Sequence, residues 1–71
     1  MTTKLSRKQI ENGLDALLLK IITERQVEDL ERLRVGLYLL EKLGYPLKGY
    51  REIYEELRQD FEDYGLIPKT N

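Results

Sequence analysis

Apolar side chains recur at helical spacing along most of the chain, and this periodicity restricts the fold to helices packed side by side. Between residues 47 and 64 the apolar positions follow a 3-4-3-4-3 spacing, which places them along one side of a helix. No segment alternates apolar and polar residues as a half-buried strand does. The sequence therefore predicts an all-α fold. The residues of this third apolar stripe are Leu47, Tyr50, Tyr54, Leu57, Phe61 and Tyr64.

Two glycines mark the expected ends of the second and third helices. Gly44 and Gly65 each follow a periodic apolar segment, and a proline comes soon after each of them. Glycine readily adopts the left-handed conformation that ends a helix, and proline cannot continue one. We therefore expect helix ends near residues 43 and 64. The start of the third helix is open between Pro46 as its first residue and Gly49 as its N-cap, and we predict a helix over 46–64.

Two similar segments mark the expected helix starts. Ser6 and Thr23 are each followed three residues later by a glutamine, Gln9 and Gln26. In a capping box of this kind the hydroxyl accepts a hydrogen bond from the glutamine backbone, and the glutamine side chain reaches back to the cap. These segments predict a first helix over 7–22 and a second over 24–43.

The apolar stripes of the first two predicted helices support a break between them. The stripe of residues 27–40 lies roughly 140° around the helix axis from the stripe of residues 10–21. A straight continuous helix would have to bury two different faces, so we expect a turn near Thr23, with one long bent helix as the alternative. The chain, 71 residues long, then forms a single domain over 1–71 with short tails, as a small three-helix bundle or helical-hairpin array.

The composition argues against catalysis. The chain has no cysteine and no histidine, which removes thiolate nucleophiles, the usual near-neutral acid or base, and the commonest metal ligands. Its only serine, Ser6, is assigned to a cap. Pairs of carboxylates lie off the apolar stripes, where they are solvated rather than buried as acid–base chemistry requires. We expect no enzyme, no cofactor and no metal site.

The location expected from the sequence is the cytoplasm. No uninterrupted apolar run exceeds four residues, whereas a membrane-spanning helix needs roughly 20. No apolar segment of signal-peptide length follows the polar N-terminus. We therefore expect no membrane association.

Apolar residues outside the main stripes indicate self-association. Val35 and Leu39 lie on the opposite side of the second helix from its stripe, and Leu19 lies off the stripe of the first helix. Three helices in one monomer seldom cover two faces of each helix, so these side chains need a second subunit. We predict a homodimer that completes the bundle, with Leu19, Val35 and Leu39 at or near the contact.

The third helix also carries an acidic line that points to a protein partner. Glu52, Glu56, Asp60 and Asp63 fall within roughly 80° of one another, opposite the apolar stripe. We predict a non-enzymatic protein-binding regulator, adaptor or inhibitor whose partner offers a basic surface. The other explanation of this line of acids is a solvated helix face that keeps the protein soluble. The alternative is a dimeric helical regulator that binds RNA or DNA. Its nucleic-acid contacts would be basic residues of the first helix and its flanks, namely Lys4, Arg7, Lys8 and Arg25.

Overall fold

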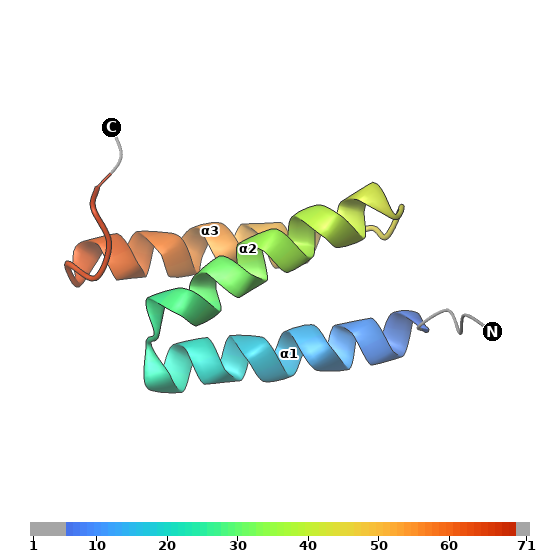
Figure 1. Ribbon diagram of the computed structural model, residues 1–71, viewed down its shortest axis with the longest axis horizontal. Coiled ribbons are helices and arrows are strands. Elements are labelled where there is room, and N and C mark those ends of the chain that lie inside the picture. The colour runs from blue at the N-terminus through green and yellow to red at the C-terminus, as the bar shows by residue number, and fades with distance from the viewer. Residues whose placement is uncertain (1–5, 70–71) are drawn as a thin grey trace.

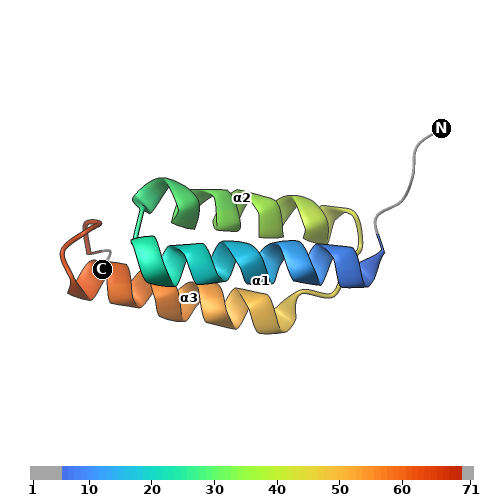
Figure 2. The same ribbon diagram turned by 90° about the horizontal axis from the view of Figure 1, so that it is seen from below.

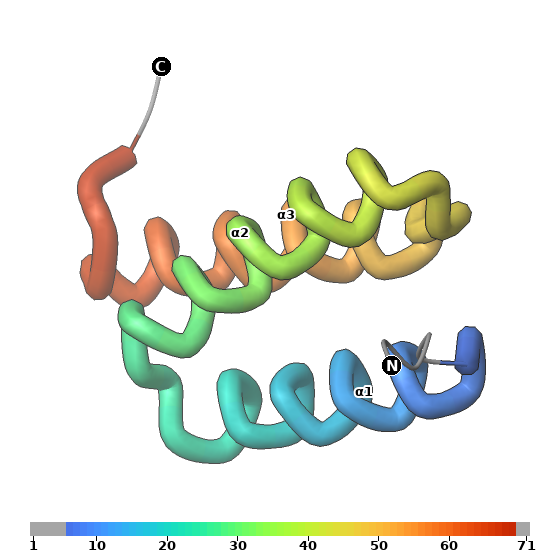
Figure 3. Tube along the Cα trace, turned by 45° about the vertical axis from the view of Figure 1, so that its right-hand side comes forward, coloured from blue at the N-terminus to red at the C-terminus, as the bar shows by residue number. Residues whose placement is uncertain are grey.

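The computed structural model describes residues 6–69 and shows three helices connected by short turns (Figure 1). These are α1 (Arg7–Glu24), α2 (Val27–Lys42) and α3 (Lys48–Asp63). The chain reverses direction at each turn, so α1 and α3 run the same way and α2 runs against both (Figure 3). No strand occurs in this part of the chain. The prediction of a small all-α bundle of three helices is therefore confirmed.

The first helix begins where the sequence predicts. The Ser6 hydroxyl accepts a hydrogen bond from the backbone N–H of Gln9 at 3.1 Å, and the backbone N–H of Ser6 donates to the Gln9 side chain at 2.9 Å. Both halves of the capping box are present. The start of α1 is thus determined by local hydrogen bonding alone.

The prediction that Thr23 caps the second helix is wrong. Thr23 lies in the last turn of α1, and its hydroxyl donates to the backbone carbonyl of Leu19 at 2.9 Å. The chain turns two residues later, at Arg25, which adopts the left-handed conformation with φ 52°. The α2 N-cap is Gln26, without a side-chain hydrogen bond. Two separate helices are confirmed, but a hydroxyl already bonded to the preceding turn is not available to cap the next helix.

Replacement of Thr23 distinguishes these two roles. We expect Thr23→Ala to leave the free energy of unfolding unchanged or to raise it by a few tenths of a kcal/mol, because alanine is the better residue inside a helix. Loss of a cap would instead lower it by about 1 kcal/mol. Urea denaturation of both proteins, followed by circular dichroism, measures the difference, and a loss near that size would restore the capping role.

The two glycines predicted to end the second and third helices do follow the ends of α2 and α3. Gly44 and Gly65 have φ values of 92° and 74°, in the left-handed region. The backbone N–H of the following residue reaches back to the carbonyl three positions before the C-cap, from Tyr45 to Leu40 and from Leu66 to Phe61. This is the Schellman arrangement, and it satisfies carbonyls that the helix end leaves free. The ends of α2 and α3 therefore agree with the prediction to within one residue.

The start of α3 differs from both predicted alternatives. Pro46 is not its first residue and Gly49 is not its cap. The N-cap is Leu47, which makes no capping hydrogen bond through its side chain. The Leu47 side chain is buried among the core residues instead. This helix therefore begins at a buried leucine and not at a residue that caps it.

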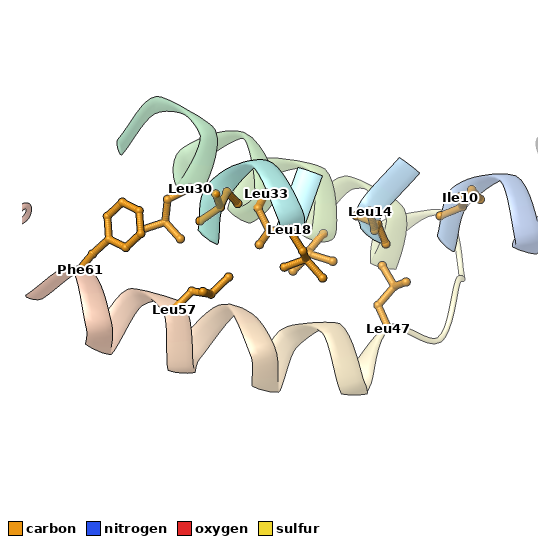
Figure 4. Close-up of a cluster of buried hydrophobic side chains, with 10 residues drawn as sticks. Ile10, Leu14, Leu18, Leu30, Leu33, Leu47, Leu57 and Phe61 are labelled. Atoms are coloured by element: carbon orange, nitrogen blue, oxygen red, sulfur yellow. The ribbon is translucent and has the colours of Figure 1, made fainter. Parts of the chain in front are cut away.

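The core lies between the three helices, and all three contribute to it (Figure 4). Phe61, Ile21 and Leu33 are its largest fully buried side chains. The predicted apolar stripe of α3 is buried at Leu57 and Phe61, whereas Tyr64 is 65% exposed and lies outside the core. The Arg25 guanidinium carbon lies 4.5 Å from the centre of the Tyr64 ring. The buried apolar residues are Ile10, Leu14, Leu18, Ile21, Leu30, Leu33, Leu37, Leu47, Leu57 and Phe61.

Candidate protein-binding surfaces

Several charged side chains form ion pairs within the fold. Asp29 is buried at the start of α2, and Lys20 of α1 and Arg32 of α2 lie 3.7 and 3.4 Å from its carboxylate. Between α2 and α3, Arg51 Nη1 lies 2.9 Å from Glu41 Oε2. The Lys20–Asp29 and Arg51–Glu41 pairs connect neighbouring helices, whereas Arg32–Asp29 lies within α2. The remaining pairs lie within single helices, namely Arg7–Glu11, Arg34–Glu31 and Arg58–Glu62.

The four acids singled out on α3 have no such cationic partners. All four are exposed, and none of them forms an ion pair in the described part of the chain. Only Asp63 has a side-chain hydrogen bond, which it accepts from Gln59 Nε2 at 3.0 Å. We call Glu52, Glu56, Asp60 and Asp63 the acidic strip. It is a line of negative charge that the fold does not neutralise.

The outer side of α2 exposes apolar side chains. Val35 is 41% exposed and Leu39 is 55% exposed, and both border a shallow groove whose residues all belong to α2. Gly36 lies in the groove, with no atom of a neighbouring residue close to where a Cβ would stand. In Figure 2, α2 lies at one edge of the bundle, with α1 and α3 both on its other side. We call this surface the α2 face, and its residues are Val27, Glu28, Glu31, Arg32, Val35, Gly36 and Leu39.

Leu19, the third residue predicted at a dimer contact, lies elsewhere. It is 63% exposed. On α1 it lies about 40° from Asp15, whose carboxylate accepts a hydrogen bond from Tyr50 of α3, and about 100° from Lys20, which pairs with α2. Leu19 is also about 160° from the buried Ile21, so it lies on the outward side of α1, nearer the flank of Asp15 than that of Lys20. The structure brings Val35 and Leu39 together but separates Leu19 from them.

The basic residues proposed for nucleic-acid binding do not form one surface. Arg7 pairs with Glu11 at the start of α1, where Lys8 is exposed without an ion pair. Arg25 follows the other end of the same helix, roughly 27 Å away along its axis, and stacks on Tyr64. Lys4 lies outside the described residues. The described members of this set are thus split between opposite ends of the molecule.

A basic groove between α2 and α3 was not foreseen from the sequence. It has a volume of about 670 Å³ and collects four cations from two helices. Three of these cations pair with glutamates, and the Lys42 ammonium lies 5.3 Å from the centre of the Tyr38 ring. Of these contacts only Arg51–Glu41 joins α2 to α3. An anionic ligand would have to displace the glutamates, so we do not assign this groove to ligand binding. Its cations are Arg34, Lys42, Arg51 and Arg58.

Two tyrosines at the helix contacts act as structural hydrogen-bonding or packing groups. Burial raises the pKa of Tyr50, and the hydrogen bond that its hydroxyl donates to Asp15 at 3.0 Å raises it further. Burial also raises the pKa of Tyr54. Both phenols stay protonated at neutral pH, since the ordinary pKa of tyrosine is already about 10. Neither therefore supplies the near-neutral titration that general acid–base catalysis uses.

Comparison with known proteins does not identify the chain. No family model matches it, and neither the curated proteins nor the solved structures contain a match. None of the helices in residues 6–69 combines the length and apolarity needed to cross a membrane. Within the same residues, no three acidic side chains lie close enough together to hold a metal ion. Function must therefore be argued from the acidic strip and the α2 face.

Proposed function

We propose that this protein is a non-enzymatic helical binding module, a regulator, adaptor or inhibitor acting in the cytoplasm, and that its acidic strip docks on a basic surface of another protein. One observation carries the proposal. In the described part of the chain the fold pairs acids on all three helices with cations, yet it leaves without a cation four carboxylates that lie together along one side of α3. Because these carboxylates form no ion pair within the fold, they are available to bind a cationic surface of a partner protein.

The energetics favour a role in recognition over one in stability. Glu52 and Glu56, and Glu56 and Asp60, are like charges four residues apart, a spacing that costs a helix a few tenths of a kcal/mol for each pair. A basic partner surface would remove this repulsion. Complementary charge of this kind chiefly speeds association and selects the partner, and adds less to affinity.

Charge reversal on the strip tests the proposal. We expect Glu56→Lys combined with Asp60→Lys to fold as the wild type does, because both side chains are exposed, and to lose most of the binding to the native partner. The measurement is affinity capture from the source cells with each protein as bait, with and without nuclease. Raising the salt to about 0.5 M should imitate the loss, since exposed charges are screened at that ionic strength.

A matched control separates the strip from net charge. Glu24→Lys combined with Glu55→Lys changes the net charge by the same amount at exposed positions outside the strip, and it should retain the partner. Equal capture by the strip variant at every salt concentration would show that the strip is only a solvated face. Capture that nuclease abolishes would instead support the nucleic-acid alternative and overturn the proposal.

A further inference from the structure

The α2 face has a symmetric order of charges about Val35. Glu28 lies seven residues before Val35 and Lys42 lies seven residues after it. Seven residues are close to two helical turns, so Glu28 and Lys42 each lie about 20° from Val35, and about 40° from each other, around the helix axis. Leu39 is only about 40° from Val35. The α2 face therefore has Glu28 at one end and Val35 and Leu39 in its middle, and Lys42 lies just beyond its other end. The other two charges of the face, Glu31 and Arg32, are paired within α2.

Both terminal charges are available to a partner. Glu28 and Lys42 are exposed, and neither forms an ion pair with any residue of the described part of the chain. Lys42 also borders the basic groove between α2 and α3, where its ammonium lies 5.3 Å from the centre of the Tyr38 ring of its own helix. Because Gly36 has no side chain, another helix can approach closely beside Val35. The face thus offers a flat apolar centre with two opposite charges about 21 Å apart along the helix.

We propose that a second copy of this chain covers the α2 face, with the two α2 helices antiparallel and a two-fold axis passing beside Val35. In that arrangement Glu28 of each subunit faces Lys42 of its partner, so a single contact forms two identical ion pairs. A parallel arrangement would instead place like charges together at both ends. The isologous antiparallel pair also covers the same apolar centre on both subunits, as two-fold symmetry requires.

The antiparallel contact is favourable at its centre as well as at its ends. Val35 meets the partner's Val35 at the axis, and Leu39 of each subunit lies one turn away, beside the partner's Glu31, so half-exposed apolar side chains of both subunits lose contact with water. The helix dipoles of the two α2 helices also oppose each other, with the acidic start of one beside the basic end of the other. The acidic strip is on α3 and takes no part, so this proposal does not depend on the proposed function.

Reciprocal charge exchange tests the register directly. Glu28→Lys gives each subunit two basic ends, and Lys42→Glu gives each subunit two acidic ends. We expect the wild type to be a dimer by analytical ultracentrifugation, and each single variant to dimerise at least roughly tenfold more weakly because two pairs become repulsive. An equal mixture of the two single variants should form a heterodimer, and the double variant should dimerise as the wild type does.

Two controls keep this test falsifiable. Lys48→Glu and Glu55→Lys alter exposed charges of α3 outside the α2 face, and neither should change dimerisation. Circular dichroism verifies that each variant is folded. Leu39→Glu should also dissociate the dimer, which tests the apolar centre independently of the charges.

Three results would overturn the proposal. The first is a compact wild-type monomer at about 1 mM, which would be the outcome if a different protein covers the α2 face. The second is dimerisation of both single variants at wild-type strength, which would place the contact elsewhere. The third is failure of the mixed single variants to form a heterodimer while both remain folded, which would exclude the antiparallel register.

Discussion

Phe61→Ala is expected to lower the free energy of unfolding by about 3–5 kcal/mol, the usual cost of removing a fully buried aromatic ring. Phe61 is 0% exposed, and in Figure 4 its ring points toward Leu30 of α2. Small domains are commonly stable by only about 5 kcal/mol or slightly more. This loss leaves about 0–2 kcal/mol, so we expect the variant to be marginally stable and partly unfolded at 25 °C. Urea denaturation followed by circular dichroism provides the measurement.

The matched control for this prediction is Ile53→Ala. Ile53 lies on the same helix and is 38% exposed, so its truncation should cost no more than about 1 kcal/mol, since little buried area is lost. If Phe61→Ala lowered the stability by no more than this control does, the assignment of Phe61 to the centre of the core would be wrong.

Removal of the cations around Asp29 is expected to have the second largest effect. Lys20→Met combined with Arg32→Met should lower the free energy of unfolding by about 1–3 kcal/mol, because a buried carboxylate loses both cations that lie beside it. The Asp29 side chain is 4% exposed, whereas the two cations are largely exposed, so each cation alone should matter less. Methionine keeps most of the aliphatic stem, which limits the loss of packing. Thermal and urea denaturation provide the measurement.

The triple variant that adds Asp29→Leu tests the cause. With the buried charge gone, we expect most of the lost stability to return, because replacing a buried ionic group by an apolar one of similar size is often neutral. The return should be incomplete, since Asp29 also lies in the first turn of α2, where the helix dipole favours an acid. A double variant as stable as the wild type would show that Asp29 reaches water without its cations.

Several local features of the fold were predictable from the residues alone. The Ser6 capping box and the glycine stops at Gly44 and Gly65 formed as predicted. Each depends on backbone groups within a few residues of the cap, so no distant part of the chain can alter it easily. The 3.6-residue periodicity likewise indicated which sides of the helices face inward, as the buried Leu57 and Phe61 illustrate.

Predictions from local sequence patterns were wrong where a side chain had a competing contact. Thr23 has the same spacing to a glutamine as Ser6, but it is preceded by a helical turn whose carbonyls accept its hydroxyl. Ser6 is the residue just before α1, and its hydroxyl caps that helix instead. Tyr64 continues the apolar stripe of α3, but it comes at the end of the helix, where Arg25 rather than the core covers its ring. In both cases a neighbouring group, and not the spacing along the sequence, determines which contact the side chain makes.

The candidate surfaces divide in the same way between sequence and structure. Helical spacing alone places Glu52, Glu56, Asp60 and Asp63 on one side of α3, and Val35 and Leu39 on one side of α2, because residues three and four apart are neighbours on a helix. Only the tertiary structure decided which charges are paired across helices, that Asp29 is buried, and that Leu19 is separated from the α2 face. Those outcomes depend on how the helices are placed against one another. That placement comes from burial of apolar area, a non-directional force summed over the whole core, and no local pattern specifies it.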